Sequence, residues 1–372
     1  MKKIVHIIGD LSIGGTERAL FTLLTNSHNQ EFKNYVIVLT GKGYFLDELK
    51  NAGIRVFALN LNSFFTSPLK LFNLILLVHK IKPDILQGWM YHSNLIVLLL
   101  KYTFIRKPII IWNIRQSLYS FANEKKTTVF VIKVLKIFSP FVEKIIYNSN
   151  TSKIHHQDFG FSSASSFVIP NGFNTEIWKF NEKNRKEIRN RLKIDENELV
   201  LGYVGRFHKI KNIGLLLNAL IPIMNSHLNL KVVFIGKDLD NNNPFFKKFD
   251  NYLPKNKILK LGICNNISHY LSAFDAFCLC SNSEAFPNVL GEAMSSSLFC
   301  ISSNVGDVPY ILGDTGLIFP NNDMNALRNA IEYWIKNHQA LKVKGKMARH
   351  RIEDLFKTEF TANQYTALYL NK

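Results

Sequence analysis

Short apolar runs alternate along the chain with longer segments in which apolar residues recur every three or four positions. Runs such as Ile4-Val5-His6-Ile7-Ile8 have the length and composition of buried parallel strands, and the longer segments predict helices. This alternation predicts an α/β fold with helices on both faces of a parallel sheet. In the first half of the chain we expect strands at Lys3–Ile8, Asn34–Leu39, Arg55–Ala58, Ile85–Gln87, Ile109–Trp112 and Lys144–Asn148.

The second half repeats the pattern, and a turn signal separates the two halves. We expect its strands at Leu199–Val204, Lys231–Ile235, Ile258–Leu261, Ala276–Cys280, Phe299–Ser302 and Gly316–Phe319. The segment Ile169-Pro170-Asn171-Gly172 has the composition of a hinge. A chain of 372 residues is also too long for one ordinary core. The sequence therefore predicts two Rossmann-like domains, residues 1–172 and 173–354, followed by a C-terminal segment, 355–372.

The charge of the chain is strongly positive and unevenly distributed. The formal net charge is +18, which indicates an anionic partner such as nucleic acid, a membrane surface or a phosphorylated ligand. Residues 70–144 hold twelve Lys or Arg against three Asp or Glu, half of the whole excess. Within this segment, Glu124–Phe138 alternates lysines with apolar residues. Such a helix suits peripheral contact with an anionic membrane, and it equally suits a core-packed helix with a solvated lysine face.

Several classes of protein do not fit the sequence. No nucleic-acid recognition motif accompanies the positive charge, so we do not expect a nucleic-acid partner. No secretory signal is visible, and lysines interrupt or end the apolar runs at 95–100 and 129–138 before they reach the length of a membrane span. The four cysteines fit neither a zinc template nor a disulfide framework, so we expect reduced thiols and a cytoplasmic location: Cys264, Cys278, Cys280 and Cys300.

The stretch Ser283–Glu292 follows the expected strand Ala276–Cys280 and precedes an expected helix at Ala293-Met294. Ligands of open α/β sheets bind at such strand ends, and the N–H groups of a first helical turn attract phosphate. Glu284 and Glu292 would then address hydroxyl groups of a ligand whose phosphates lie on the backbone between them, which is the layout of a sugar nucleotide. Two ordinary solvated acids are the alternative.

Two further loops carry residues suited to a phosphorylated ligand. Arg206 and Lys211 follow the expected strand Leu199–Val204, where a planar guanidinium and an ammonium group can hold a diphosphate and stabilise it as a leaving group. Near the N-terminus, Gly14-Gly15-Thr16-Glu17 leads from the first strand into a helix. This glycine loop allows close approach of a ligand, although a tight turn explains it equally well, and it lacks the G-x-G-x-x-G spacing.

Two side chains at strand ends of the first half are additional candidates. His92 follows the expected strand Ile85–Gln87, and Arg115 follows Ile109–Trp112. Either can contact a sugar or a phosphate, and for His92 a structural role is at least as well supported.

Together these segments resemble the retaining glycosyltransferases of family 4, which have the two-domain GT-B fold. Glu284 and Glu292, with seven residues between them, look like the paired-glutamate motif of that family. Gly205-Arg206 with Lys211 looks like its phosphate clamp, and Gly14-Gly15-Thr16-Glu17 like its glycine loop. Ile169-Pro170-Asn171-Gly172 is similar to its interdomain segment. The resemblance covers nearly the whole chain and implies that a C-terminal helix, Glu359–Leu370, crosses back to the first domain.

The resemblance also implies roles for single residues. The backbone around Ile263 would hold the base, Glu292 the ribose, Arg206 and Lys211 the diphosphate, and Glu284 the sugar. The implied catalytic candidates are Glu284, Arg206, Lys211, His92 and Arg115. The implied donor-binding residues are Gly14, Gly15, Gly205, Ile263, Ala285, Phe286, Pro287, Asn288, Val289 and Glu292.

Two positions depart from the family pattern. Many relatives have a histidine where this chain has Asn113-Ile114-Arg115, so both His92 and Arg115 are candidates for the residue that faces the donor sugar. Asn174 stands where an aspartate is frequent, and we interpret this position as structural. Enzymes of this family generally need no metal, so we expect no metal and no cofactor.

The sequence thus predicts a retaining glycosyltransferase that uses a nucleotide diphosphate sugar, UDP-linked, and a glycan or lipid-linked glycan acceptor in cell-surface polysaccharide synthesis (capsule, lipopolysaccharide or O-antigen). Its expected place is the inner face of the cytoplasmic membrane, which residues 70–144 would contact. Two alternatives stay open: a GT-B sugar-nucleotide epimerase, and a catalytically silent GT-B protein that serves as a binding partner or scaffold.

Overall fold

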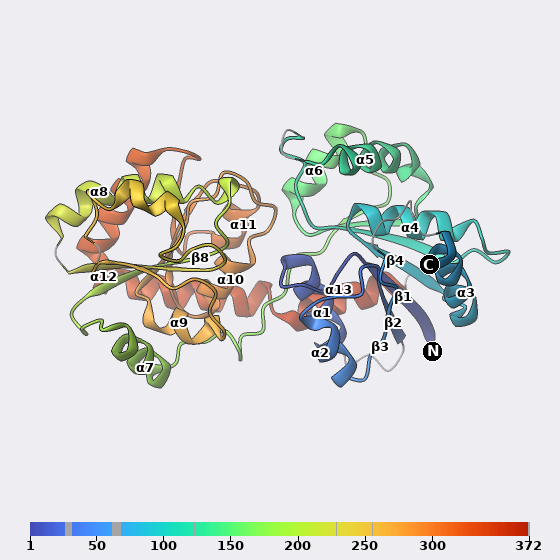
Figure 1. The fold of residues 1–372 in the computed structure, drawn as a ribbon, viewed down its shortest axis with the longest axis horizontal. Coiled ribbons are helices and arrows are strands. Elements are labelled where there is room, and N and C mark those ends of the chain that lie inside the picture. Colours follow the sequence, from blue (N-terminus) through green and yellow to red (C-terminus); the bar gives the residue numbers. More distant parts are fainter. Residues whose placement is uncertain (27–31, 62–67, 122–123, 228, 255, 371–372) are drawn as a thin grey trace. The chain divides into compact units, whose positions relative to one another are not determined.

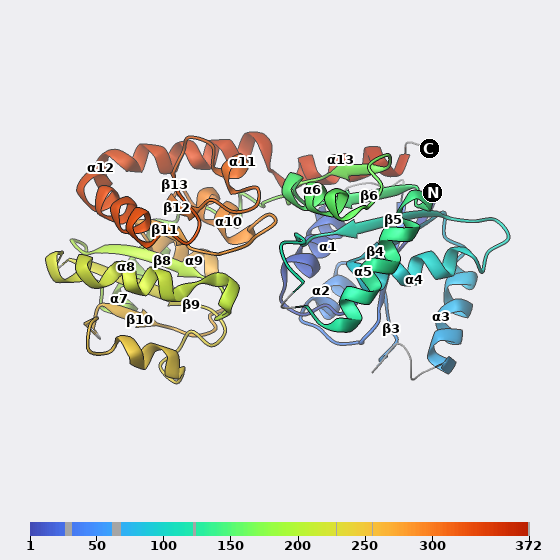
Figure 2. The same ribbon diagram turned by 90° about the horizontal axis from the view of Figure 1, so that it is seen from above.

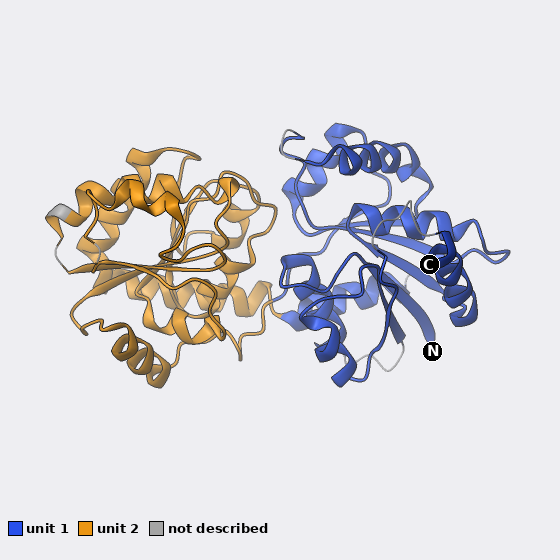
Figure 3. Ribbon diagram, in the orientation of Figure 1, with its two compact units in different colours: residues 1–172, 358–372 blue, residues 173–357 orange. Residues whose placement is uncertain are grey.

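The computed structural model describes residues 1–26, 32–61, 68–121, 124–227, 229–254 and 256–370. The chain forms two compact units: unit 1 comprises Met1–Gly172 and Thr358–Lys372, and unit 2 comprises Phe173–Lys357 (Figure 3). Each unit has its own parallel sheet with helices on both faces (Figure 1). The α/β fold class expected from the alternating pattern is therefore confirmed.

The sheet of unit 1 has seven parallel strands in the order β3-β2-β1-β4-β5-β6-β7. The order reverses between β1 and β4, which are neighbours in the sheet. The strands are β1 (Lys2–Ile8), β2 (Phe32–Val38), β3 (Arg55–Ala58), β4 (Ile85–Trp89), β5 (Ile109–Ile114), β6 (Lys144–Tyr147) and β7 (Ser166–Val168). The helices are α1 (Gly15–Asn26), α2 (Phe45–Asn51), α3 (Pro68–Ile81), α4 (Tyr91–Lys101), α5 (Lys126–Phe138), the 3₁₀ turn η1 (Ser139–Phe141), α6 (Asn150–Phe159) and α13 (Thr358–Leu370).

Alternate residues of each strand feed two separate cores. On β1, Val5 and Ile7 face a core formed with α3, α4 and α5, whereas Ile4 and Ile8 face a core formed with α1, α2 and α13. Because a parallel strand is buried on both faces, its sequence is continuously apolar, which is why these strands are visible in the sequence. Figures 1 and 2 show the two groups of helices on opposite faces of the sheet.

The C-terminal helix α13 belongs to unit 1, as the family resemblance implies. Tyr369 donates to Gln87 (2.5 Å) and Asn113 donates to Tyr365 (2.5 Å), so the helix is hydrogen-bonded to β4 and β5. Lys2 donates to the carbonyl of Tyr369 (3.1 Å) and Lys144 to that of Leu368. Two ammonium groups at a helix C-terminus satisfy its free carbonyls and complement its dipole.

The sheet of unit 2 has six parallel strands in the order β10-β9-β8-β11-β12-β13, and this order reverses between β8 and β11. The strands are β8 (Leu199–Val204), β9 (Leu230–Ile235), β10 (Ile258–Lys260), β11 (Ala276–Leu279), β12 (Phe299–Ser303) and β13 (Leu317–Phe319). The helices are α7 (Glu182–Leu192), η2 (Lys209–Lys211), α8 (Ile213–Ser226), η3 (Pro244–Phe249), α9 (Ile267–Ala273), α10 (Asn288–Ser295), α11 (Val308–Leu312) and α12 (Met324–Leu355).

Helix α12 contributes to both cores of unit 2. Its first part places Leu327, Ile331 and Trp334 in the core under α8, and its last part places Ala348 and Ile352 in the core that contains α9, α10 and α11. Figure 2 shows this long helix in orange to red along one side of the unit. It is interspersed with charged residues, and no helix among the described residues is long and apolar enough to cross a membrane.

The strands differ little from the prediction. The expected strands form within two residues of their expected ends, and β7 is the strand that the sequence did not reveal. β7 has three residues, Ser166 to Val168, of which Phe167 is exposed, so it carries no apolar run.

Candidate functional site

The loops that follow β8 and β11 lie side by side at the carboxyl edge of the unit 2 sheet. β8 and β11 pair with each other at the point where the strand order reverses. Such a switch point is where open α/β sheets bind ligands, because the chain leaves the two strands in opposite directions and opens a space between the loops. The loop after β8 carries Arg206 and Lys211, and the loop after β11 carries Glu284.

Lys211 and Glu284 meet at this switch point. The Lys211 ammonium lies 2.5 Å from Glu284 Oε1, and the Ser281 hydroxyl donates to the same oxygen (2.7 Å). The side chains are 21% and 14% exposed, so both remain within reach of a ligand. Oε1 takes both of these contacts, which leaves Oε2 for a hydroxyl group. The structure thus brings together two residues that the sequence placed 73 positions apart.

Arg206 is exposed on the same loop, two residues after β8 ends. Gly205 and the loop after β9 are in close contact: the Gly205 amide donates to Ile235 O (2.9 Å), and a Cβ on Gly236 would lie 1.8 Å from Gly205 O. The Gly236 amide donates to Gly262 O (2.7 Å), next to Ile263, whose side chain is 71% exposed. The backbones after β8, β9 and β10 therefore line one edge of the sheet.

Ser283–Glu292 is only partly a loop, which corrects the sequence interpretation. Helix α10 begins at Asn288 after Pro287, so Val289 is in its first turn, and Glu292 is its fifth residue and nearly buried. Proline is favourable at this position because an N–H group there would have no partner within the helix, and proline has no N–H group. No acidic residue lies in the first turn of α10.

The start of this segment is fixed by contact with the loop after β12. Ala285 accepts the amide of Asp307 (3.0 Å), and both Ala285 and Phe286 are buried. A Cβ on Gly306, which has φ +54°, would lie 2.3 Å from Glu284 O. Gly236 and Gly306 were both missed in the sequence, although they follow the expected strands Lys231–Ile235 and Phe299–Ser302 by one and four residues. A search for glycine after strand ends would detect them.

In unit 1 the glycine loop leads into α1, which begins at Gly15. A Cβ on Gly14 would lie 2.2 Å from the Glu17 carboxylate, so this side chain folds back over the loop. Burial raises the pKa of Glu17, and the nearby Asp10 adds to this shift, while Arg115 opposes it. Glu17 belongs to the predicted motif, and the structure places it in the first turn of α1.

His92 and Arg115 lie at the carboxyl edge of the unit 1 sheet in different settings. His92 is exposed in the first turn of α4, and partial burial together with the charge of Lys125 lowers its pKa. Arg115 donates to Asn113 Oδ1 (3.4 Å), to Tyr365 Oη (3.4 Å) and to Asn171, and lies over the ring of Trp89. The guanidinium thus has several partners inside unit 1, which include helix α13 and the interdomain segment.

A buried histidine that the sequence did not single out supports the start of α4. His156 lies 2.7 Å from the carbonyl of Ser152 through Nδ1 and 3.0 Å from Tyr91 Oη through Nε2. Burial lowers the pKa of His156 to about 4, so the ring is neutral at pH 7. Since a carbonyl only accepts, Nδ1 carries the proton and the Tyr91 hydroxyl donates to Nε2. Tyr91 is next to His92 in the first turn of α4, and its hydrogen bond to His156 of α6 fixes this turn.

The remaining predictions from sequence concern metal ligands, cysteines and Asn174. The chain contains one Asp-x-Asp segment, Asp238-Leu239-Asp240 after β9, in which Asp240 accepts the amide of Asn242 (2.8 Å). In the described ranges no three His, Cys, Asp or Glu side chains are grouped to hold a metal ion. The absence of a metal requirement stays a prediction.

All four cysteines are free thiols. Asn174 accepts the amides of Glu176 (3.0 Å) and Ile177 (3.1 Å), a structural turn.

Comparison with known families decides what kind of protein has this site. A model described as "Glycosyltransferase Family 4" matches residues 13–177, and one described as "Glycosyl transferases group 1" matches residues 184–351. The chain is a GT-B glycosyltransferase of family 4 type. The two family models adjoin near the junction of the two units. Together they include the glycine loop of unit 1 and the loops after β8 and β11 of unit 2.

Relatives of this family 4 glycosyltransferase are distant. It is 25% identical to N-acetyl-alpha-D-glucosaminyl L-malate synthase of Bacillus anthracis, a match that spans about half of each protein (50% and 49%). It is 26% identical to the capsular polysaccharide biosynthesis glycosyltransferase CapM of Staphylococcus aureus (90% and 89% covered). It is also 26% identical to UDP-Gal:alpha-D-GlcNAc-diphosphoundecaprenol alpha-1,3-galactosyltransferase of Escherichia coli (67% and 66%). Anabaena HepE, solved with UDP-glucose, shares the fold (TM-score 0.85, 18% identity, 99% of both chains).

Proposed function

We propose that this glycosyltransferase moves a hexose or N-acetylhexosamine, with retention, from a UDP-sugar to a glycan or lipid-linked glycan in cell-surface polysaccharide synthesis. The observation that carries the proposal is the Lys211–Glu284 pair at the switch point of unit 2, with Arg206 on the same loop. Two cations at a strand edge suit a diphosphate, and the carboxylate beside them suits a sugar hydroxyl. The names of two relatives, a capsular polysaccharide glycosyltransferase and a UDP-galactose-dependent galactosyltransferase, support the class of donor and product.

Each proposed contact has a side chain or backbone group on unit 2. Arg206, Lys211 and the first-turn amides of α10 hold the diphosphate, and Glu284 holds a sugar hydroxyl. The backbone near Ile263 takes the base, and Glu292 takes the ribose. In the reaction the bond between the anomeric carbon and the β-phosphate oxygen breaks, and the acceptor oxygen bonds to that carbon on the same face. The acceptor proton passes to the leaving phosphate, whose developing charge Arg206 and Lys211 stabilise. With these cations in place, we propose that no metal is needed.

A thermal-shift screen tests the donor. We expect UDP and UDP-sugars to raise the melting temperature and GDP-mannose to leave it unchanged, because a ligand stabilises the state that binds it. At about one hundred times the Kd, the stabilisation is about 2.7 kcal/mol, which corresponds to roughly 5–10 °C for a unit of this size. The absence of a shift with every uridine nucleotide contradicts the proposal.

Product analysis with the stabilising donor then separates the classes of activity. Transfer to a polyprenyl-diphosphate-linked sugar, with the anomeric configuration of the donor kept, is the expected result. A changed donor sugar in the absence of acceptor identifies an epimerase instead. Binding without transfer, hydrolysis or epimerisation identifies a silent binding protein.

We further propose that unit 1 contacts the anionic inner face of the cytoplasmic membrane through residues 70–144, of which 122 and 123 lie outside the described residues. Helix α3 begins at Pro68, two residues before this segment, and three of its large apolar side chains share one exposed stripe at intervals of three and four residues: Leu69 (71% exposed), Phe72 (54%) and Leu76 (52%). Helix α5, packed on the same face of the sheet (Figure 2), buries Val131, Ile132 and Leu135 and exposes Phe130 and Lys133. Exposed apolar side chains among lysines are more stable in contact with an anionic lipid surface than in water.

Vesicle sedimentation tests this contact. We expect the protein to bind vesicles that contain phosphatidylglycerol and to bind neutral vesicles less, with weaker binding at high salt. A Leu69→Ser/Phe72→Ser variant should bind about tenfold less, because it loses apolar area that would enter the interface. A Tyr333→Ser/Val343→Ser variant, altered at two exposed apolar residues of α12, is the matched control. Equal binding of the two variants contradicts a role for α3.

A further inference from the structure

Asn212 joins three loops at the carboxyl edge of the unit 2 sheet. It lies between η2 and α8 in the left-handed conformation (φ 48°, ψ 44°). Its side-chain amide donates to Asn282 Oδ1 (2.7 Å) and to Asn322 Oδ1 (3.1 Å). Both hydrogens of the amide are thereby used, one toward the loop after β11 and one toward the segment after β13.

Two more hydrogen bonds complete this arrangement. The Asn282 amide donates to Ile210 O (2.7 Å), and the Asn321 side chain donates to Asn282 O (2.9 Å). We call Asn212, Asn282, Asn321 and Asn322 the asparagine cluster. It links the loop that follows β8 to the loop that follows β11, two strands that are neighbours only in the folded sheet.

The cluster adjoins the Lys211–Glu284 pair in the chain. Lys211 precedes Asn212 in the chain, and Glu284 follows Asn282 by two residues. Without donor, the ion pair itself helps to join the two loops. A bound donor competes with this ion pair, because its diphosphate attracts the Lys211 ammonium away from Glu284 Oε1. The asparagine cluster involves neither side chain, so it can hold the loops together while the site is occupied.

We propose that Asn212 is a positioning residue that keeps Lys211 and Glu284 in register during sugar transfer, an inference that rests on the proposed function. A competing explanation is that Asn212 is present only because asparagine tolerates the left-handed conformation. Glycine separates the two explanations, since it adopts this conformation without strain and has no amide to donate. Alanine lacks the amide and is also strained at a positive φ.

The experiment compares Asn212→Gly, Asn212→Ala and the wild type. We expect Asn212→Gly to lower kcat about tenfold while the KM for the UDP-sugar changes less than about threefold, because about 1.4 kcal/mol of transition-state positioning is lost. Its melting temperature should stay close to that of the wild type, whereas that of Asn212→Ala should fall. Asn218→Ala is the matched control, because Asn218 is exposed on α8, the helix that Asn212 precedes, and its side chain donates to Gly214 O of that helix (2.8 Å). Full turnover of Asn212→Gly overturns the proposal.

Amide hydrogen exchange of the free protein gives a second readout that needs no substrate. We expect the Asn282 amide to exchange about tenfold faster in Asn212→Gly than in the wild type or in Asn218→Ala, because local opening becomes less costly. Unchanged exchange overturns the proposal even if the enzyme uses another donor. If the wild type transfers no sugar but the exchange effect is present, the proposed donor is wrong and the role of the cluster in joining the loops stands.

Discussion

A Glu284→Gln variant should lose about two to three orders of magnitude in transfer rate while it remains folded, the magnitude typical for one group that stabilises a transition state. The Glu284 carboxylate accepts from Lys211 (2.5 Å) and Ser281 (2.7 Å) through one oxygen. Glutamine keeps the size of the side chain but has no charge with which to orient Lys211 toward the diphosphate. One substitution should therefore weaken both the proposed sugar contact and the proposed phosphate contact.

Arg206→Ala should produce a similar loss of transfer, since in the proposed reaction the guanidinium is a planar donor for the leaving diphosphate. Lys209→Ala is the matched control: Lys209 is a cation on the same loop and is exposed. Initial rates at saturating donor and acceptor, with circular dichroism of each variant, provide the measurement. Full activity in either Glu284→Gln or Arg206→Ala removes that residue from the site, and an equal loss in Lys209→Ala would show that only the charge of the loop matters.

The parts of this fold that could be predicted are those with a local signal. Buried parallel strands such as β8 and β11 are short, continuously apolar and followed by glycine or polar residues, so their positions and the loops after them can be read from the sequence. Once the strands are assigned, the polar residues that follow their carboxyl ends become candidates for a ligand site, because open α/β sheets bind ligands there. This is why Arg206, Lys211 and Glu284 were candidates before the structure placed Lys211 beside Glu284.

The parts that could not be predicted depend on contacts between distant segments. Arg115 follows a strand as a ligand residue would, but Asn171 and Tyr365, which it contacts, lie 56 and 250 residues away. The bond between Tyr91 and His156 spans 65 residues, and that between Asn212 and Asn322 spans 110. Glu292 was placed in a loop although Pro287 gave a local signal for an earlier helix start, so that error was one of interpretation.

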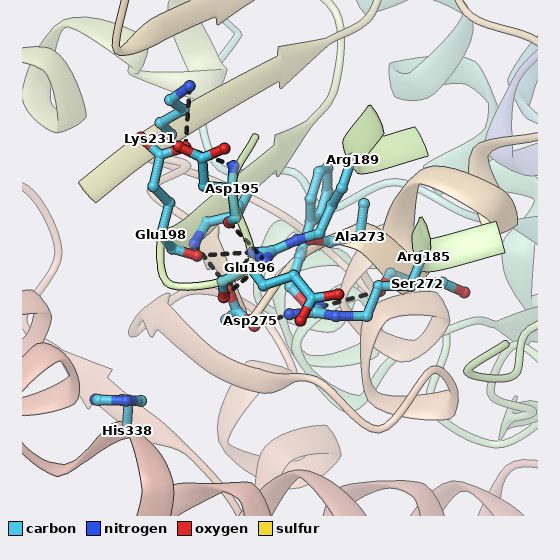
Figure 4. Close-up of polar contacts among 12 residues, drawn as sticks. Arg185, Arg189, Asp195, Glu196, Glu198, Lys231, Ser272, Ala273, Asp275 and His338 are labelled. Atoms are coloured by element: carbon cyan, nitrogen blue, oxygen red, sulfur yellow. Dashed lines mark hydrogen bonds and ion pairs between the residues drawn. The ribbon is translucent and has the colours of Figure 1, made fainter. Parts of the chain in front are cut away.

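The opposite edge of the unit 2 sheet carries a buried ionic network that should decide the stability of this unit. Asp275 precedes β11 and accepts from Arg185 (2.7 Å), Arg189 (3.0 Å) and the amide of Val200 at the start of β8 (2.8 Å). The Arg189 side chain is 4% exposed and also donates to the carbonyls of Ala273, Asp195, Glu196 and Glu198. Figure 4 shows both arginines pointing toward Asp275 from α7.

Asp275→Ala should destabilise unit 2 by about 3–5 kcal/mol, because it leaves the Arg189 charge buried without its counterion. Burial already lowers the pKa of Arg189, and Asp275 is the group that opposes this shift most strongly. For a unit of this size the melting temperature should fall by roughly 10 °C. Glu182→Ala is the matched control. Glu182 lies on α7, the helix that carries both arginines, and forms an exposed ion pair with Lys186 (3.8 Å). Such pairs contribute about 0.5 kcal/mol or less to the free energy of unfolding.

The same variant separates stability from function. Asp275 lies at the amino ends of β8 and β11, whereas Arg206, Lys211 and Glu284 lie beyond their carboxyl ends, about 20 Å away along a strand of this length. Below the melting transition, the folded Asp275→Ala protein should therefore bind UDP with unchanged affinity, measured by calorimetry at low temperature. A weakened affinity in fully folded protein would mean that the network at the amino edge also sets the spacing of the loops at the carboxyl edge.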